Sequence, residues 1–193
     1  GISKLAAHAL LEPVLATPHL RLVCHEGEFD ELLSELALHQ LDVVLAGQAA
    51  PRNPNQRLSS ERIARSTLQW YGPASLVKKP VRDRFPQSLQ DMPVLLPTFH
   101  SPLRSTLDSW FQDIGVQPRV VGEFEDSALL ATFGASGMGV FPAAERMREA
   151  LAKGYGLKWF APCEGVQEHF YAIGTARKVQ HPLVQRLLSE QPA

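Results

Sequence analysis

A chain of 193 residues can bury a substantial core and form one large domain or two small ones. Its 19 Lys and Arg residues against 20 Asp and Glu residues give a net charge of −1, so no overall field attracts it to nucleic acid or to a membrane. No apolar run approaches the roughly 18 residues of a membrane span. Cys24 and Cys163 stand in apolar sequence, which predicts small buried residues of a reducing compartment, although a disulfide is not excluded.

The first quarter of the chain predicts one βαβ unit. Ser3 is placed to cap a first helix, which Pro13 interrupts. Residues 20–24 alternate between apolar and polar and indicate a strand. Leucines at helical spacing predict a helix over 29–41, and residues 42–46 follow as a buried strand, so the succession favours a parallel sheet.

A polar loop over 51–60 separates this unit from the rest, and residues 63–71 are expected to be extended. The elements predicted next are a helical turn at 88–91, a strand at 94–96, an amphipathic helix from Leu103 to Ile114 that ends at Gly115, and a strand at 119–124. The last predicted elements are a helix at 143–151, strands at 157–160 and 169–175, and a helix at 182–188.

The segment from Gly122 to Pro142 contains a glycine cluster that looks like a nucleotide-binding loop. In such a loop the glycines precede the helix, so that its N-terminus faces the phosphate. Here Asp126 or Ser127 caps a helix, and the glycines come after it, before a short buried strand that Pro142 ends. The order predicts glycines that lead a helix into a strand.

Two βαβ sets and a late strand near Ile173 predict two α/β lobes. The first lobe comprises residues 1–70 and receives the chain again over 169–193, and the second comprises 71–168. The chain then crosses between the lobes twice, and the crevice between them is the expected ligand site.

Motifs of catalysis are missing from the sequence. The histidines show no i, i+4 pair, and no Gly-x-Ser-x-Gly or Gly-x-x-x-x-Gly-Lys-Ser motif occurs. The run His25-Glu26-Gly27-Glu28 suggests metal ligands, but neighbouring strand residues point to opposite faces. A small α/β enzyme is therefore the least favoured function.

Polar residues cluster instead where predicted strands end. Glu28 follows the first strand, residues 98–101 follow the strand at 94–96, and residues 125–127 follow the strand at 119–124. Open parallel sheets bind ligands beyond the carboxyl ends of their strands. Ordinary helix capping, by Ser101 and Asp126 above all, is the alternative explanation of the same residues.

Several segments resemble the effector-binding region of LysR-type transcriptional regulators. They are Leu10-Leu11-Glu12-Pro13, Leu41-Asp42-Val43-Val44-Leu45, residues 104–111 and the passage from Gly137 to Pro142. Residues 4–7, 10–15 and 122–129 are similar, more narrowly, to the NhaR-like branch, whose members activate sodium/proton antiporter genes in response to sodium.

The resemblance implies an α/β fold of two Rossmann-like subdomains joined by two crossover strands, as in periplasmic binding proteins. It implies no enzyme activity and a homodimer, with a tetramer as an alternative for the full-length protein. The family's N-terminal winged helix-turn-helix is absent from this chain, so DNA binding is expected only through that missing domain. The family's usual first strand also has no counterpart before Ser3.

The resemblance places an effector against residues of the crevice, and the residues expected there are Ser3, Glu28, Thr98, Phe99, His100, Asp126 and Ser127. A hard cation such as sodium would take oxygen ligands, for which Glu28, Thr98, Glu125 and Asp126 are the candidates, whereas an organic acid would prefer helix N-termini and hydroxyls. The expected protein is a cytoplasmic sensing domain without a resident cofactor. A periplasmic-type solute-binding protein is the alternative.

Overall fold

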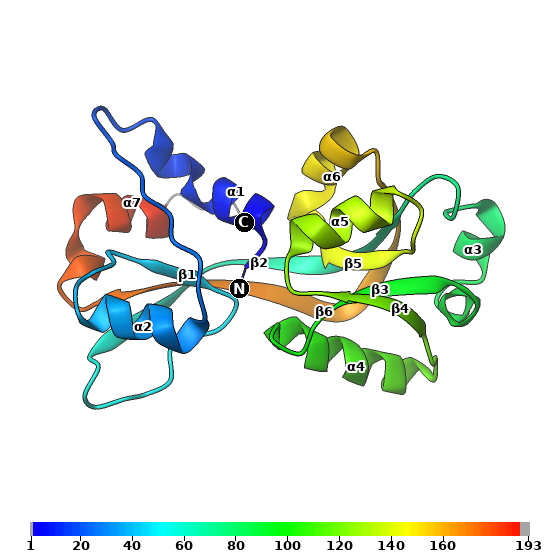
Figure 1. Cartoon of the computed structure of the whole chain (residues 1–193), viewed down its shortest axis with the longest axis horizontal. Helices are drawn as coiled ribbons and strands as arrows, with labels where there is room; N and C mark the ends of the chain where they lie inside the picture. The colour runs from blue at the N-terminus through cyan, green and yellow to red at the C-terminus, as the bar shows by residue number, and fades with distance from the viewer. Residues whose placement is uncertain (1, 190–193) are drawn as a thin grey trace. The chain divides into compact units, whose positions relative to one another are not determined.

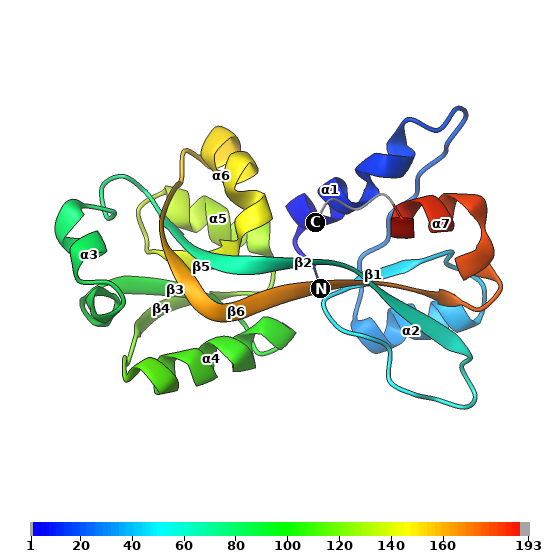
Figure 2. The same ribbon diagram turned by 180° about the vertical axis from the view of Figure 1, so that it is seen from behind.

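The computed structural model of the chain describes residues 2–189 and divides into two compact units. Unit 1 contains the residues up to Arg65 and those from His169 onward, and unit 2 runs from Ser66 to Glu168. The long strands β2 (Leu58–Gly72) and β6 (Lys158–Thr175) each pass from one unit into the other (Figures 1 and 2). The sheet that contains them has the strand order β1-β6-β2-β5.

Unit 1 is built on the short strand β1 (Val44–Ala46), which pairs antiparallel with β6 so that Val44 lies opposite Ile173. Helix α2 (Phe29–Ala37) packs against β1, because Leu33 and Leu36 face the core of this unit. Helix α1 (Lys4–Leu15) packs on α7 (Pro182–Ser189) on the side opposite α2 (Figure 1).

Unit 2 contains a pair of parallel strands, β3 (Pro93–Pro97) and β4 (Arg119–Phe124). Helix α4 (Pro102–Ile114) covers one face of this pair and α5 (Ser127–Ala135) the other (Figures 1 and 2). The remaining elements of unit 2 are α3 (Lys79–Asp83), the 3-10 turns η1 (Gln87–Asp91) and η2 (Glu145–Met147), strand β5 (Phe141–Ala144) and α6 (Arg148–Tyr155). A last 3-10 turn, η3 (Lys178–Gln180), precedes α7 in unit 1.

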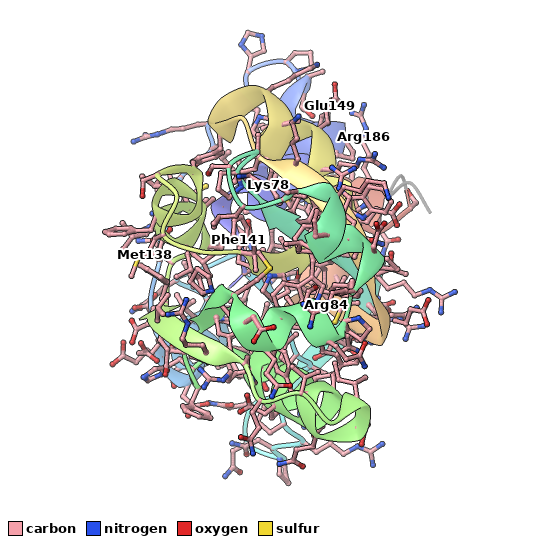
Figure 3. The ribbon with its side chains drawn as sticks, turned by 90° about the vertical axis from the view of Figure 1, so that its right-hand side faces the viewer. Lys78, Arg84, Met138, Phe141, Glu149 and Arg186 are labelled. Carbon is pink, nitrogen blue, oxygen red and sulfur yellow. The ribbon has the colours of Figure 1, made fainter. Side chains whose placement is uncertain are left out.

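The core of unit 2 is rich in aromatic side chains. Trp70 packs against Trp110 and Phe111, with ring centroids 6.0 and 5.9 Å away. Phe141 is also buried in this unit, whereas Lys78 and Arg84, at the two ends of α3, are exposed (Figure 3). The apolar face of α4 is thus buried inside unit 2.

The glycine segment packs a helix against strands, as its order predicts. A Cβ on Gly134 would lie 2.5 Å from the Phe141 ring, and one on Gly139 would lie 2.8 Å from the carbonyl oxygen of Pro93. Val140, between these positions and β5, exchanges backbone hydrogen bonds with β3, donating to the Pro93 oxygen at 3.0 Å. The glycines therefore allow close approach of backbones rather than room for a phosphate.

Five sequence-based predictions about local structure are wrong. Residues 20–24 form no strand, so no βαβ unit includes β1, which pairs antiparallel with β6. Cys24 is exposed rather than buried. Pro142 lies inside β5 instead of ending a strand, because β5 is at the edge of its sheet and a missing N–H costs no ladder bond there. The predicted helix over 143–151 begins only at Arg148, since Ala143 pairs with β2. The two predicted strands over 157–175 are one continuous strand.

Among residues 2–189, every helix is too short or too polar to cross a membrane.

Candidate functional site

The carboxyl ends of β3 and β4 form one edge of unit 2. The two strands run parallel with Pro97 opposite Phe124, so the segments that leave them start side by side. Helix α4 begins at Pro102 after the first of these segments, and α5 begins at Ser127 after the second. The edge therefore brings two helix N-termini, which favour negative charge, next to the polar residues that follow the strands.

Thr98 occupies the centre of this edge. Its backbone N–H donates to the Phe124 oxygen at 3.1 Å, which continues the pairing of β3 with β4 by one residue. Its Oγ1 is buried and makes no hydrogen bond with any residue that the structure describes. A buried hydroxyl without a partner is uncommon in proteins and marks a position where a bound group could supply one.

Two capping residues flank Thr98. Ser101 Oγ accepts from the Leu103 N–H at 3.3 Å and caps α4, and Asp126 Oδ1 accepts from the Leu129 N–H at 2.8 Å and caps α5. Each side chain uses one acceptor in its cap, and Asp126 brings a negative charge to the edge in addition. Capping and ligand binding are thus compatible roles for the same residue.

A second pair of side chains lies across the two segments. His100 Nε2 lies 3.5 Å from Glu125 Oε1, and both side chains are exposed. Contacts between such exposed groups contribute little to stability. Their position beside Asp126 and Ser127 makes them available to a ligand at this edge.

Arg104 joins the ends of β3 and β4 through hydrogen bonds. Its Nη1 donates to the Pro97 oxygen at 2.8 Å and to Glu123 Oε2 at 3.1 Å, and its Nε donates to Asp108 Oδ1 at 3.0 Å. The side chain is only 8% exposed. Burial alone would lower the pKa of Arg104, but the hydrogen bonds to the two carboxylates outweigh it and raise the pKa above its ordinary value.

Phe99 covers this guanidinium on its outer side. The Arg104 Cζ lies 4.2 Å from the centroid of the Phe99 ring, in cation–π geometry, although the ring itself is 72% exposed. The arrangement leaves an exposed aromatic surface next to Thr98 and His100. Arg104 is not among the site residues predicted from the sequence. The sequence features that point to it are the i, i+4 spacing to Asp108 and its position one turn after Ser101.

Five of the residues predicted for the site are brought together at the edge of unit 2, and they are Thr98, Phe99, His100, Asp126 and Ser127. Ser3 and Glu28 belong to unit 1. Ser3 Oγ accepts from the Ala6 N–H at 3.4 Å and caps α1, and Glu28 stands at the start of α2, where its carbonyl accepts from the Leu32 N–H. Within the described range 2–189, no group of three or more His, Cys, Asp or Glu side chains could hold a metal ion.

The family described as "LysR substrate binding domain" matches residues 2–190. The chain is a LysR substrate-binding domain. This family is not one of enzymes, which agrees with the catalytic motifs missing from the sequence. The membership does not favour the alternative of a periplasmic-type solute-binding protein.

The transcriptional activator protein NhaR of Escherichia coli is 28% identical to this LysR domain over 184 residues, which is 95% of the chain. The chain spans 60% of the length of that relative. The family resemblance drawn from the sequence is thereby confirmed.

Solved structures show the same fold at lower identity. The cofactor-binding domain of the Cbl transcriptional regulator matches with a TM-score of 0.73 and 20% identity, covering 95% of this chain and 81% of that one. The regulatory domain of CcmR from Synechocystis PCC6803, in complex with 2-PG, matches with a TM-score of 0.68 and 13% identity over 97% and 93% of the chains. LysR regulatory domains have the two-subdomain fold of periplasmic binding proteins, as the sequence predicted.

Proposed function

We propose that this LysR domain is the sensing region of a transcriptional activator and binds its effector at the edge formed by Thr98, His100 and Asp126. The observation that carries the proposal is the buried Thr98 hydroxyl without a hydrogen-bond partner, placed between two helix N-termini. A polar effector atom would complete its hydrogen bonding. Phe99 offers an exposed apolar surface beside it.

We also propose, more narrowly, that sodium is the signal and that the full-length protein controls antiporter genes in the cytoplasm. The segments that resemble the NhaR-like branch support this, as does the similarity to an NhaR protein at 28% identity. The oxygen ligands would come from Glu125 and Asp126, since hard cations prefer carboxylate and carbonyl oxygens. No resident cofactor is needed for this function.

Asp126→Asn separates capping from cation binding. Asn caps a helix about as well as Asp, so the variant should melt within a few degrees of the wild type. If the carboxylate binds sodium, the melting temperature of the wild type should rise in sodium chloride relative to potassium chloride at equal ionic strength, and this difference should shrink in the variant. Matched ionic strength removes screening as a cause.

Asp126→Ala is the matched control for the cap. It removes both the charge and the acceptor of the Leu129 N–H, so it should lose about 1 kcal/mol of stability together with the sodium response. A sodium response in Asp126→Asn as large as that of the wild type would assign Asp126 to the helix cap alone and would count against sodium binding at this edge.

We further propose a homodimer, and a tetramer for the full-length regulator, which binds DNA through an N-terminal domain outside these 193 residues. Regulators of this family act generally as oligomers. The partner surface is not the apolar face of α4, because Trp110 and Phe111 are buried inside unit 2. Sedimentation equilibrium of the chain at micromolar concentration measures the association, and a monomer throughout would contradict it.

A further inference from the structure

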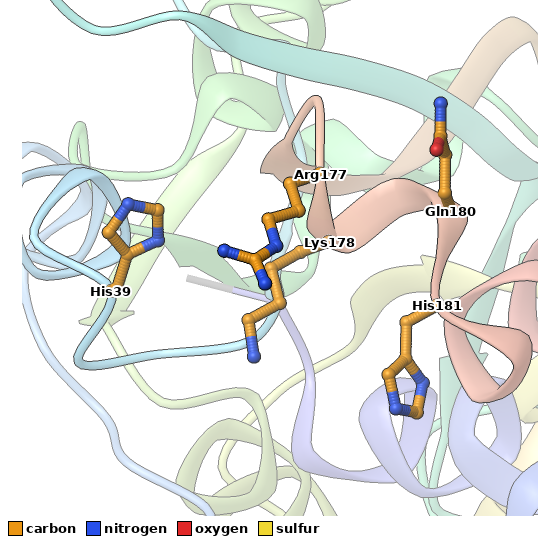
Figure 4. A pocket seen from close by; sticks show the side chains of 5 residues that line it. All are labelled: His39, Arg177, Lys178, Gln180 and His181. Carbon is orange, nitrogen blue, oxygen red and sulfur yellow. The ribbon is translucent and has the colours of Figure 1, made fainter.

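A second hollow, far along the sequence from Thr98, lies in unit 1 between the end of α2 and the start of α7. It has a volume of about 470 Å³, and the residues that line it are His39, Arg177, Lys178, Gln180 and His181 (Figure 4). None of these residues belongs to the edge formed by Thr98, His100 and Asp126 in unit 2, which is called the effector edge below. The volume falls within the range of roughly 300–1,000 Å³ that small-molecule sites occupy.

The two cations of this pocket differ in their partners. Lys178 Nζ donates to Asp42 Oδ1 at 2.5 Å, so its charge is balanced at the rim. Arg177 makes no hydrogen bond or ion pair with any residue in the range 2–189. Its guanidinium reaches toward His39, with the Lys178 ammonium on the same side (Figure 4). The pocket therefore holds one unbalanced positive charge with all its N–H donors available.

The two histidines of the pocket are each fixed by a local hydrogen bond. His181 Nδ1 accepts from the Leu183 N–H at 3.2 Å, which leaves the proton of the neutral ring on Nε2 as a donor. His39, two residues after the end of α2, has a φ of 60°, a left-handed conformation that is strained for a residue with a side chain. Its own N–H donates to the Leu36 oxygen at 3.0 Å, so the backbone at this wall is tied to the helix.

We propose that this pocket binds a small anion that carries a phosphate group. The lining combines the Arg177 guanidinium with side-chain nitrogens of Lys178 and two histidines. A guanidinium matches phosphate oxygens with paired hydrogen bonds. A duplex nucleic acid fits less well, because it requires a basic stripe, whereas Asp42 stands beside Lys178 here and the chain has a net charge of −1. The site is a second ligand site, independent of the effector edge.

Calorimetric titration of the 193-residue chain with inorganic phosphate and with pyrophosphate tests the proposal. The wild type should bind at least one of them, and Arg177→Gln should bind it roughly tenfold more weakly or worse, because a charge-assisted pair is lost. Arg52→Gln is the matched control, since Arg52 is an exposed arginine of the same unit outside the pocket. Equal affinity in wild type and Arg177→Gln, or no binding by the wild type, would overturn the proposal.

Two further measurements fix the place and the class of the ligand. Thr98→Val should bind phosphate like the wild type, and a loss of binding in this variant would locate the anion at the effector edge instead. In a mobility-shift assay with duplex DNA, the chain should give no shift that depends on Arg177. A shift that depends on Arg177 would show that the pocket binds nucleic acid instead of a small anion. Arg177 is exposed, so equal melting temperatures of Arg177→Gln and wild type confirm that folding is unchanged.

Discussion

At the scale of the residue, the Thr98 hydroxyl is a buried polar group for which no described residue supplies a hydrogen-bond partner, as is also true of Thr17 Oγ1 in unit 1. A buried polar group without a partner costs about 1–3 kcal/mol, and a protein gains by avoiding it. The Thr98 N–H donates to the Phe124 oxygen and the Thr98 carbonyl accepts from the Ser101 N–H, so only the side chain is left without a hydrogen-bond partner. We infer that the protein retains this unfavourable group because a bound ligand supplies the missing hydrogen bond.

Thr98→Val should therefore stabilise the free protein. Valine has a similar shape without the unpartnered hydroxyl, so the free energy of unfolding should rise by about 1 kcal/mol. Denaturant unfolding measures the change.

Thr67→Val is the control for this substitution, because the Thr67 hydroxyl donates to Glu145 Oε2 at 2.6 Å and its loss should destabilise. A Thr98→Val protein that is destabilised as much as Thr67→Val would show that the Thr98 hydroxyl is satisfied in solution and that the argument for a ligand there is wrong.

At the scale of the element, Arg104 joins one helix to two strands. It lies on α4 and donates to the Pro97 oxygen at the end of β3 and to Glu123 on β4. Asp108, one turn later on α4, orients the guanidinium. The direction in which Thr98 and Asp126 leave their strands depends on this connection.

Arg104→Met keeps most of the apolar stem and removes the charge. We expect a loss of about 2 kcal/mol in the free energy of unfolding, less than for a fully buried pair, because Asp108 and Glu123 remain partly exposed to water. Arg82→Met, on the exposed surface of α3, should change it by less than about 0.5 kcal/mol. Equal effects of the two substitutions in thermal or denaturant unfolding would contradict this role for Arg104.

Elements with strong local signals could be predicted from the sequence, and those that depend on partners could not. The helix ending at Gly115 and the strand from Arg119 to Phe124 were predicted because leucine spacing, a C-terminal glycine and a β-branched run agree. Residues 20–24 alternate like a strand, yet no described strand lies beside them to share hydrogen bonds, so Leu22 and Val23 are 48% and 60% exposed. Strand formation therefore depends on a neighbouring strand as well as on the sequence of the segment itself.

The candidate site divides in the same way. Thr98 and Asp126 could be found from sequence because both follow strands and precede helices. The missing hydrogen bond of the Thr98 hydroxyl could not be predicted, because it depends on the positions of all the surrounding atoms in the folded chain. Arg104 was missed because its partners lie at Pro97 and Glu123, which sequence spacing does not connect. Arg177 was missed because it meets His39 only in the folded unit.

At the scale of the whole molecule, two long strands carry the chain between two units, each with a core of its own. The pairing places Val44 and Ile173 in one sheet and β3 and β4 in another, and an isolated bridge from Val94 to Val140 links β3 to the segment before β5. The proposed effector edge lies in unit 2 and the proposed anion pocket lies in unit 1.

We propose that a ligand binds at the ends of β3 and β4. Backbone amide NMR of the chain, titrated with sodium chloride, potassium chloride and a panel of small organic acids, locates such binding residue by residue. An effective ligand should shift the amide signals of Thr98, His100 and Asp126, and Thr98→Val should weaken those shifts. Shifts confined to other residues, with these three unchanged for every compound, would show that none of these ligands binds at this edge.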